Sequence, residues 1–283
     1  MPIYPGFPES RIKYMVEDSG LTMLVTDMCY KELMDSIDYR DTIKNRVYMD
    51  AHIVTAGNGD DDGCNGPNTN VINLVREVRP SNIGYPIYTS VTTGNPKGFM
   101  FNHKCAVEMI QLDWYKEHGQ VGIDVVGLFS NYVFDGSIQT MFSTLGSGLT
   151  LSMDTKNCTM AECTPSMTSF LLDDDTNNIH SIIVAGEVCP HGLEAKFKNF
   201  LNGYGPTECS IWATKSFIYD TIGRPLPNVL CYVVHPDDGT ICLPGASGEL
   251  CIGGIGVNWE YCNQPELTTE KSVKNPFRRE SIV

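Results

Sequence analysis

Short apolar runs separated by polar and turn residues recur along the 283-residue chain. Near its start, Ile12, Met15 and Val16 repeat at about the helical period. Gly20 follows them, and a glycine just past the last apolar position is a usual stop signal, so a short helix is predicted. Residues 22–26 (Thr-Met-Leu-Val-Thr) then predict a buried strand. No strand precedes that helix, so we expect this sheet to lack a neighbouring strand.

An alternation of strands and helices is predicted for the middle of the chain. Strands are predicted where short apolar runs are bounded by turn residues, at 84–88, 125–129, 149–153 and 182–185. Helices are predicted between such runs, at 138–145 and 193–200. This order is typical of a mostly parallel sheet covered by helices, so the fold class is α/β. Residues 58–70 hold Gly, Asp or Asn at almost every position, which predicts a mobile surface loop.

The pattern changes from Ile222 onward. A strand, a turn and a second strand are predicted there, at 230–234, 236–239 and 248–253. We therefore expect an α/β core over residues 1–220 and a β-rich subdomain over residues 221–283.

Composition narrows the functional class. The chain is 42% hydrophobic, which suffices for a sizeable core, but no apolar run is long enough to span a bilayer. The first residues lack the apolar segment of a secretory signal, so a cytoplasmic location is expected. A net charge of −14 repels nucleic acid and anionic lipid, and we expect neither as a partner. The 11 cysteines include no Cys-x-x-Cys pair, which favours reduced core thiols over metal ligands.

The segment with the clearest chemistry is 88–98, Tyr-Thr-Ser-Val-Thr-Thr-Gly-Asn-Pro-Lys-Gly. Hydroxyl groups, glycines at Gly94 and Gly98, and the charge of Lys97 together suit phosphate oxygens, even within an acidic protein. The spacing is not that of a Walker A loop. From the residues alone, a polar surface loop explains this segment equally well.

The same segment resembles the phosphate-loop signature Tyr-Thr-Ser-Gly-Thr-Thr-Gly-x-Pro-Lys-Gly of the adenylate-forming superfamily, and specifically the adenylation domains of nonribosomal peptide synthetases. Further segments match this family in the required order, at 4–20, 134–137, 202–208, 222–225, 248–254 and 263–268. These matches cover almost the whole chain. The resemblance implies the large N-terminal domain of that fold, with mostly parallel sheets flanked by helices plus a β-rich subdomain.

The resemblance also implies roles for individual residues around ATP. The loop over the phosphates would be formed by Thr89, Ser90, Thr92, Thr93, Gly94 and Lys97. Tyr204 would lie against the adenine, with Asn202 and Gly205 nearby. Thr207 would reach the α-phosphate, and Glu208 would hold Mg²⁺, because a hard dication prefers carboxylate oxygen. Lys97, Thr207 and Glu208 are the implied catalytic residues. Without the resemblance, Glu208 would be interpreted as a solvated turn carboxylate.

Asp135 matches the family position whose carboxylate pairs with the α-ammonium of an amino acid, which implies an amino acid rather than a simple fatty or aryl acid. A buried carboxylate needs such a partner, because an unpaired buried charge is costly. The alternative is that Asp135 caps the helix that follows it. The same alignment implies that the pocket walls include Gly136, Gln139, Ile183, Ala185, Gly203, Ile211 and Trp212. Trp212 and Gln139 would make this pocket small and partly polar.

The implied reaction is attack of the substrate carboxylate on the α-phosphorus of ATP, which releases pyrophosphate and leaves an acyl adenylate. Catalysis would come from positioning and charge stabilisation, without a protein nucleophile. In complete relatives, the phosphopantetheine thiol of a carrier protein domain then takes the acyl group.

Three departures from the family pattern change what we expect. Val91 stands where the signature has glycine, and a β-branched residue resists positive φ. Between Leu151 and Thr164 the chain is shorter than its relatives, so a helix and a strand beside the acid pocket are expected to be missing. The chain also ends before the ribose-binding Asp and the small C-terminal lid domain with its catalytic lysine.

These departures predict an incomplete chain with impaired activity. Two functional alternatives stay open: a noncatalytic nucleotide-binding remnant, and acyl-CoA-ligase-like activation of a non-amino carboxylic acid. A third alternative is a chain that does not fold stably.

Overall fold

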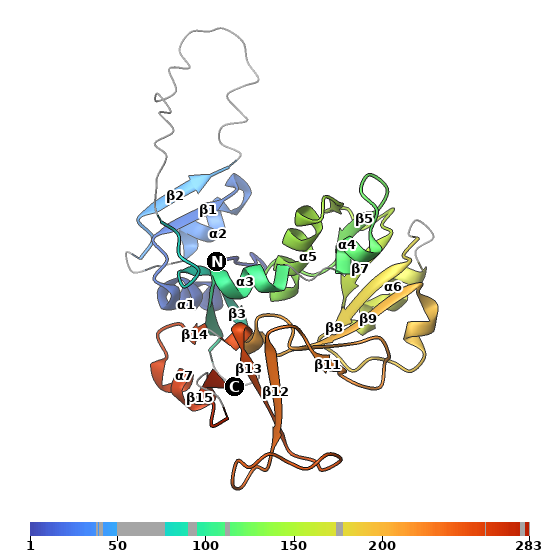
Figure 1. Cartoon of the computed structure of the whole chain (residues 1–283). Helices are drawn as coiled ribbons and strands as arrows, with labels where there is room; N and C mark the ends of the chain where they lie inside the picture. The colour runs from blue at the N-terminus through green and yellow to red at the C-terminus, as the bar shows by residue number, and fades with distance from the viewer. Residues whose placement is uncertain are drawn as a thin grey trace.

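A computed structural model describes residues 1–37, 39, 42–49, 77–89, 95–110, 114–173, 178–257, 259–277 and 281–282. The loop predicted at 58–70 and most of the predicted phosphate loop, residues 90–94, lie outside this part of the chain. The fold has three parts: an N-terminal unit, a large central sheet and a group of C-terminal strands (Figure 1). In the described residues, no helix has the length and apolar character needed to cross a membrane.

The N-terminal unit contains helices α1 (Glu9–Ser19) and α2 (Lys31–Ser36) and strands β1 (Met23–Thr26) and β2 (Asn45–Tyr48). Helix α1 is confirmed: it buries its three predicted apolar residues and ends at Gly20, whose φ of 64° is left-handed. Strand β1 is confirmed, but its burial was predicted wrongly. Met23 and Val25 are 51% and 56% exposed because they lie on the face of the strand opposite to the buried Leu24. Strand β1 pairs with β2 in a two-stranded parallel sheet of the described residues. Strand β2 was not predicted, since its sequence Asn-Arg-Val-Tyr has little apolar pattern.

The central sheet has seven strands in the order β11-β10-β9-β8-β7-β5-β6. Five are parallel: β5 (Val125–Leu128), β6 (Thr150–Ser152), β7 (Met160–Cys163), β8 (Ser181–Ala185) and β9 (Asn199–Tyr204). The antiparallel strands β10 (Thr214–Ser216) and β11 (Arg224–Pro225) extend one edge. The predicted mostly parallel sheet is therefore confirmed.

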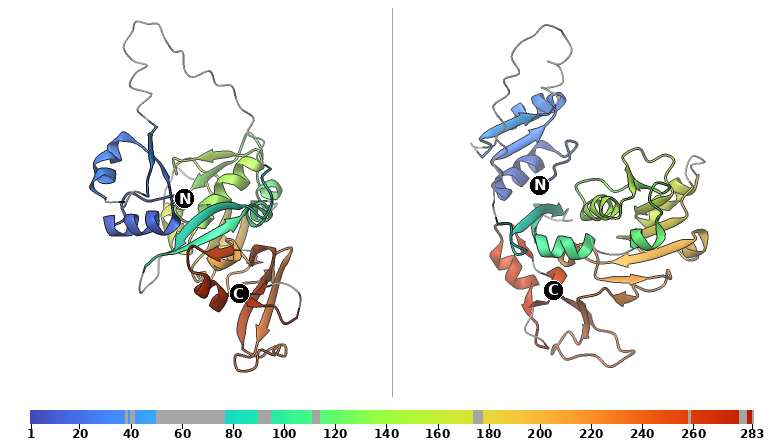
Figure 2. Two further views of the ribbon diagram at one scale, coloured as in Figure 1. Left: turned by 90° about the vertical axis from the view of Figure 1, so that its left-hand side faces the viewer. Right: turned by 45° about the horizontal axis from the view of Figure 1, so that its top comes forward.

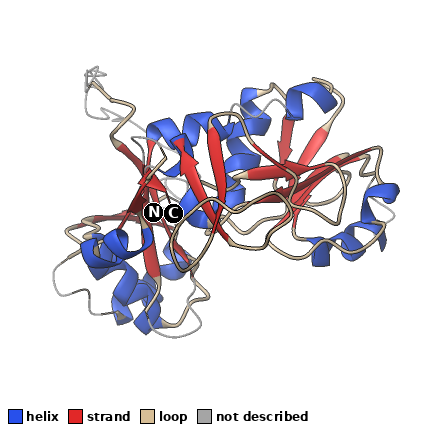
Figure 3. Ribbon diagram, turned by 60° about the horizontal axis from the view of Figure 1, so that its bottom comes forward, coloured by secondary structure: helices blue, strands red, loops and turns tan. Residues whose placement is uncertain are grey.

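Helices cover both faces of this sheet (Figure 3). On one face, Trp114 and Tyr115 of α4 (Trp114–His118) share a buried cluster with Met160 and Ile183. On the other face, Leu171 of α6 (Thr168–Asp173) shares a cluster with other residues of the same strands. Side chains alternate along a strand, so β7 and β8 contribute to both clusters and are buried almost throughout.

Two expectations for the central sheet are wrong. Residues 193–200 were predicted as a helix, but they form a 3₁₀ turn at Leu193–Lys196 followed by the start of β9. Leu193, Phe197 and Phe200 do share one cluster, as their spacing suggested, but parallel pairing with β8 holds the second half as a strand. The strand expected to be missing between 151 and 164 is present as β7, whereas the seven-residue connection 153–159 contains no helix.

A polar network joins the amino-terminal ends of the parallel strands. Asp124, only 3% exposed, accepts hydrogen bonds from the Thr159 hydroxyl at 2.8 Å and from the backbone N–H of Gln120 at 2.8 Å. His180 Nε2 lies 2.9 Å from the same carboxylate, and its Nδ1 lies 2.7 Å from the Ser181 hydroxyl. These hydrogen bonds lower the pKa of Asp124 although burial opposes them. The network therefore ties together the starts of β5, β7 and β8.

The C-terminal strands form two further sheets. Strand β14 (Trp259–Tyr261) pairs with β4 (Lys97–Asn102), and β4 pairs with β3 (Ile83–Thr89), in an antiparallel three-stranded sheet. The second sheet is antiparallel and has the order β12 (Val229–Val234), β13 (Glu249–Gly254), β16 (Ser281–Ile282) and β15 (Val273–Lys274). The strand, turn and strand predicted from 230 to 253 are confirmed as β12 and β13.

Helix α3 (His103–Ile110) follows β4, and helix α7 (Pro265–Lys271) lies between β14 and β15 in the sequence. In Figure 2, β3 and β4 (teal) lie between the N-terminal unit (blue) and the C-terminal strands (orange to red). Residues from the beginning and the end of the chain thus meet at β4.

Candidate functional site

The ends of the predicted phosphate loop are held by a β-hairpin. Thr89, the last residue of β3, is paired with Lys97, the first residue of β4. Of the predicted loop residues between them, Ser90, Thr92, Thr93 and Gly94 lie outside the described residues, as does Val91. At Gly98, a Cβ would lie 2.6 Å from the ring of Tyr88, so this glycine makes room for an aromatic ring within the hairpin. The antiparallel pairing therefore determines where the loop begins and where the Lys97 ammonium emerges.

Tyr261 connects Lys97 to Glu208. The Lys97 ammonium lies 5.6 Å from the centroid of the Tyr261 ring, within range of a cation–π interaction. The Tyr261 hydroxyl donates a hydrogen bond of 3.1 Å to Glu208 Oε1. Burial, and next the Glu208 charge, raise the pKa of Tyr261, so the phenol stays protonated and donates. One aromatic side chain thus holds the predicted phosphate-binding cation and the predicted metal ligand close to each other.

Thr207 and Glu208 lie in a 3₁₀ helix, Thr207–Cys209, that follows β9. The next two residues have positive φ, 57° at Ser210 and 82° at Ile211. Positive φ is strained for a β-branched residue, and such strain is found mainly where function or packing requires it. The Ser210 hydroxyl donates to the Gly256 carbonyl at 3.0 Å, and this contact joins the turn to the segment that follows β13.

Asp135 lies beside Thr207 and Glu208. Burial raises the pKa of Asp135, and the Glu208 charge raises it further, whereas hydrogen bonds from the Thr207 hydroxyl and the Gly136 N–H oppose the shift. Helix α5 (Asp135–Gly146) begins at Asp135, with Phe134 at the N-cap position and no side-chain cap. The Asp135 carboxylate nevertheless accepts from the Gly136 N–H at 2.9 Å. It therefore supports the start of the helix, and it also faces the Thr207–Glu208 turn.

The end of β9 carries the residues predicted to lie near the adenine. The Tyr204 side chain is 39% exposed, so part of its ring is accessible. Asn202 is buried and its amide donates to the Thr221 carbonyl at 3.1 Å, which anchors the loop before β11. At Gly205, a Cβ would lie 2.5 Å from the Cα of Trp212, so the strand end packs directly on the turn after Glu208.

Several predicted walls of the acid pocket belong to one buried cluster. Ile183, Ile211 and Trp212 lie in the same cluster, and the partly buried Ala185 packs against it. Gly203 allows the Trp212 indole to lie flat against β9, since a Cβ there would be 2.8 Å from the ring. The structure thus brings these walls together at the carboxyl ends of β8 and β9.

Helix α5 contributes a polar buried face that includes two predicted wall residues, Gly136 and Gln139. Gln139 is 1% exposed, and its amide nitrogen and oxygen have no hydrogen-bond partner among the described residues. A Cβ on Gly136 would lie 3.6 Å from Oε1 of Glu162, a residue of β7 that the sequence reasoning missed. Glu162 was missed because the strand that carries it was expected to be absent. An acidic residue within the apolar run Met-Ala-Glu-Cys was the available signal.

Glu162 is a buried carboxyl group, 3% exposed. Its Oε2 accepts from the Thr140 hydroxyl at 2.9 Å and the Tyr115 hydroxyl at 3.1 Å. Burial raises its pKa to about 8, and the charge of Asp135 contributes in the same direction, while the two hydroxyl groups oppose the shift. Burial thus favours the protonated form of Glu162.

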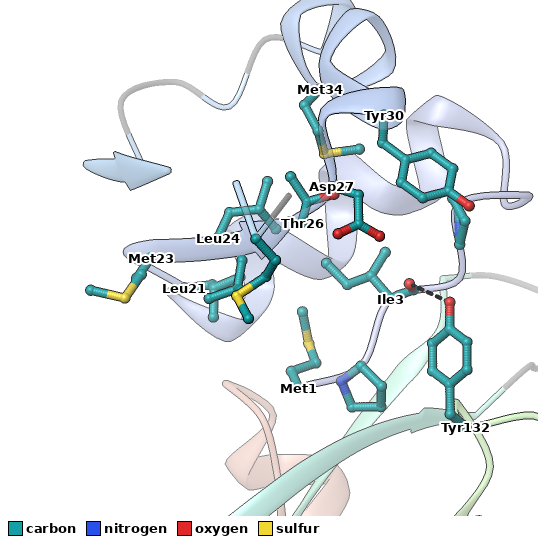
Figure 4. Close-up of a pocket in the computed structure, with 14 residues that line it drawn as sticks. Met1, Ile3, Leu21, Met23, Leu24, Thr26, Asp27, Tyr30, Met34 and Tyr132 are labelled. Atoms are coloured by element: carbon teal, nitrogen blue, oxygen red, sulfur yellow. Dashed lines mark hydrogen bonds between the residues drawn. The ribbon is translucent and has the colours of Figure 1, made fainter. Parts of the chain in front are cut away.

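A cavity of about 520 Å³ lies away from all of these residues, in the N-terminal unit (Figure 4). Leu21 and residues 23–27 line it along β1, and Tyr132 closes it with a 3.3 Å hydrogen bond to the Ile3 carbonyl. None of the predicted site residues contributes to its walls. The cavity follows the exposed strand β1 and is separate from the candidate site.

The sequence model of a known family, described as "AMP-binding enzyme", matches residues 1–262. The chain belongs to the AMP-binding enzyme family. Among curated relatives, tyrocidine synthase 2 of Brevibacillus parabrevis is 34% identical over 303 residues, which are 98% of this chain and 8% of the relative. Gramicidin S synthase 1 of Brevibacillus brevis is 30% identical over 98% of this chain and 26% of the relative. The chain thus spans a small part of the length of these two relatives.

Two solved structures have the same fold as this chain. The nonribosomal peptide synthetase FmoA3 has a TM-score of 0.74 at 21% identity, over 99% of this chain and 32% of that one. The N-terminal domain of FACL13 from Mycobacterium tuberculosis has a TM-score of 0.74 at 18% identity, over 99% of this chain and 78% of that one. At these identities the likeness shows the fold alone. It agrees with the predicted fold class, the N-terminal domain of adenylate-forming enzymes.

Proposed function

We propose that this chain binds ATP and an amino acid and activates the carboxylate as an aminoacyl adenylate. The observation that carries the proposal is the contact series from Lys97 through Tyr261 to Glu208, and from Glu208 and Thr207 to Asp135. A cation, a metal-binding carboxylate, a hydroxyl donor and a carboxylate for an ammonium group are the parts that this reaction needs.

Each residue has a defined task in the proposed reaction. The Lys97 ammonium neutralises phosphate oxygens, and the Thr207 hydroxyl donates to the α-phosphate that the substrate carboxylate attacks. Asp135 pairs with the α-ammonium of the amino acid, which offsets the cost of desolvating this carboxylate. The part of Tyr204 that is accessible stacks on the adenine. The predicted loop residues Ser90, Thr92, Thr93 and Gly94 complete the phosphate contacts in this proposal.

Mg²⁺ fits the carboxylate of Glu208. Among the described residues, no three His, Cys, Asp or Glu side chains form a metal-binding group. A single carboxylate suits Mg²⁺, which commonly keeps several waters and takes its other ligands from substrate phosphates. When bound, the ion neutralises charge on the phosphate oxygens. The hydrogen bond from Tyr261 orients Oε1 of Glu208 and leaves the second carboxylate oxygen for the ion.

The acceptor in the proposed reaction sequence is the phosphopantetheine thiol of a carrier protein domain. The relatives that support this proposal are named tyrocidine synthase 2 and gramicidin S synthase 1, and they are much longer than the present chain. The thiol would attack the carbonyl carbon of the adenylate and release AMP.

Pyrophosphate exchange with ATP, Mg²⁺ and a panel of amino acids tests the proposal. We expect the wild-type chain to catalyse exchange with at least one amino acid. The exchange rate should fall by at least about 100-fold in Lys97→Ala and in Glu208→Gln. It should not change in Lys271→Ala, the control at an exposed position. In Asp135→Ala, amino acids should lose their advantage over the matching carboxylic acids that lack an amino group. If ATP binds in calorimetry but no acid supports exchange, the chain binds nucleotide without turnover. Equal activity in Asp135→Ala would contradict the amino-acid assignment.

A further inference from the structure

The last turn of α1 contacts the hairpin that carries Lys97. The Tyr88 hydroxyl donates a hydrogen bond of 2.7 Å to Asp18 Oδ2. Tyr88 is 5% exposed, and Asp18 is half-buried. Burial raises the pKa of Tyr88, and the hydrogen bond to Asp18 acts in the same direction, so the phenol stays protonated and donates. A carboxylate of the N-terminal unit thus binds the strand that ends at Thr89.

The hairpin has room for the Tyr88 ring at Gly98. Tyr88 is paired with Gly98 across the two strands. A Cβ at Gly98 would lie 2.6 Å from Cζ of Tyr88 and 2.9 Å from its hydroxyl oxygen. A larger residue at this position would displace the ring from Asp18, because atoms cannot pack at such separations. The ring therefore crosses β4 at the residue that directly follows Lys97.

The same turn of α1 also binds the chain on the other side of Lys97. The backbone N–H of Cys262 donates to the Gly98 carbonyl at 2.8 Å, at the end of the pairing between β14 and β4. The side-chain amide of Asn263 donates to the backbone carbonyl of Asp18. These two residues directly follow Tyr261. Asp18 thus contacts the end of β3 through its carboxylate and the segment after β14 through its carbonyl (Figure 2).

Both of these segments determine where the Lys97 ammonium lies. Thr89, which follows Tyr88, is paired with Lys97 and fixes its backbone. The Tyr261 ring lies beside the ammonium itself. A lysine ammonium is a point charge on a flexible stem, so its attraction to a phosphate depends on how well its surroundings hold it. Loss of the Asp18 contact would leave this cation in the site but place it less accurately.

We propose that Asp18 is a positioning residue for nucleotide binding, which acts through Tyr88 to hold the Lys97 ammonium in place for the phosphates of ATP. The proposal rests on the ATP-binding part of the proposed function and does not depend on which acid is activated. It gives α1 a role in the site, although the residues predicted to touch ATP lie on other elements.

Calorimetric titration of the full chain with ATP and Mg²⁺ tests the proposal, and adenosine is the second probe. Tyr88→Phe removes the hydroxyl and keeps the buried ring, whereas Asp18→Ala removes the acceptor. We expect each variant to bind ATP about 3- to 10-fold more weakly, because the hydrogen bond that supports the hairpin is lost. Asp18→Asn keeps an accepting oxygen and should bind ATP more tightly than Asp18→Ala. Adenosine has no phosphate, so its affinity should be equal in all of these proteins.

A double-mutant cycle with Lys97→Ala distinguishes positioning from general damage to the fold. If Tyr88 acts through Lys97, Tyr88→Phe should not weaken ATP binding further when Lys97→Ala is already present. Tyr232→Phe is the matched control, because it removes a tyrosine hydroxyl from β12, and it should leave both affinities unchanged. Thermal unfolding checks that every variant is folded at the temperature of the titration.

The outcomes separate this proposal from the one on which it rests. If the wild-type chain does not bind ATP, both are overturned. If ATP binds but no acid supports pyrophosphate exchange, adenylation fails, and the affinities still decide the role of Asp18. The positioning role alone is overturned if Tyr88→Phe binds ATP like the wild type, or if it weakens ATP and adenosine binding equally. It is also overturned if Tyr88→Phe has its full effect in Lys97→Ala, or if Asp18→Asn binds ATP no better than Asp18→Ala.

Discussion

Replacing Tyr261 with phenylalanine removes one hydroxyl group and leaves the aromatic ring in place. The ring keeps its packing on Phe99, with centroids 4.6 Å apart, and its position beside the Lys97 ammonium. The substitution removes the 3.1 Å hydrogen bond from the Tyr261 hydroxyl to Glu208. A hydrogen bond to a charged group contributes about 1.5–3 kcal/mol, and partial exposure of Glu208 reduces this to about 1–2 kcal/mol.

We therefore expect Tyr261→Phe to lower the free energy of unfolding by about 1–2 kcal/mol, measured by urea denaturation. Tyr232→Phe is the matched control, because the hydrogen bond described for its hydroxyl is a weak one of 3.4 Å from the Asn275 amide. This control should change stability by less than about 0.5 kcal/mol. The affinity for Mg²⁺ and ATP should also fall several-fold in Tyr261→Phe alone, since Glu208 loses the contact that orients it.

A double-mutant cycle with Glu208→Ala isolates the interaction. The coupling free energy between the two substitutions should be about 1 kcal/mol, because these side chains are in contact. If the coupling is zero, or if Tyr261→Phe behaves like Tyr232→Phe, the Tyr261 hydroxyl does not organise the site and the reasoning is refuted.

Three further predictions concern the core. Burial raises the pKa of Glu162 from its ordinary value of 4.5 to about 8 in the folded chain, so the free energy of unfolding should fall as the pH rises through this interval, by at most about 1.4 kcal/mol per pH unit. In urea titrations Glu162→Gln should remove this slope, and a wild-type chain without it would contradict the assignment. Gly203→Ala forces a methyl group against Trp212, so it should lower the free energy of unfolding by roughly 1–3 kcal/mol and shift the tryptophan fluorescence. Gly146→Ala is the control, because nothing lies within 4 Å of the added methyl group, and it should not destabilise the fold. Asp124→Ala removes the carboxylate that binds Thr159 and His180, so it should lower the free energy of unfolding by about 3 kcal/mol in thermal or urea unfolding. An unchanged free energy of unfolding would show that the network is dispensable for stability.

The fold was predictable from sequence where local pattern and long-range pairing agree. Ile12, Met15 and Val16 have helical spacing and a glycine stop, and they lie on a helix. Residues 193–200 have similar spacing but become largely a strand, because β8 offers a parallel partner that no local pattern reveals. The same reason explains why β2 was missed. Its four residues, Asn-Arg-Val-Tyr, show little apolar pattern, and they form a strand because β1 lies beside them.

The candidate site was predictable only as far as continuous motifs reach. The motif at 202–208 placed Thr207 and Glu208 in one turn, and the motif at 134–137 identified Asp135. No motif indicated Tyr261 or Glu162, because each reaches the site through pairing between strands distant in sequence. The roles of Ser90, Thr92, Thr93 and Gly94 stay predictions.

The pairing of β14 with β4 has a consequence for how the protein acquires its site during translation. The hairpin that carries Lys97 emerges from the ribosome long before Tyr261 does, so its outer edge stays unpaired in the meantime. Lys97 and Glu208 cannot be aligned until residues up to Tyr261 have been synthesised. A nascent chain stalled before that point would expose an open strand edge and a cluster of aromatic side chains, and it would be a natural client for a holdase chaperone.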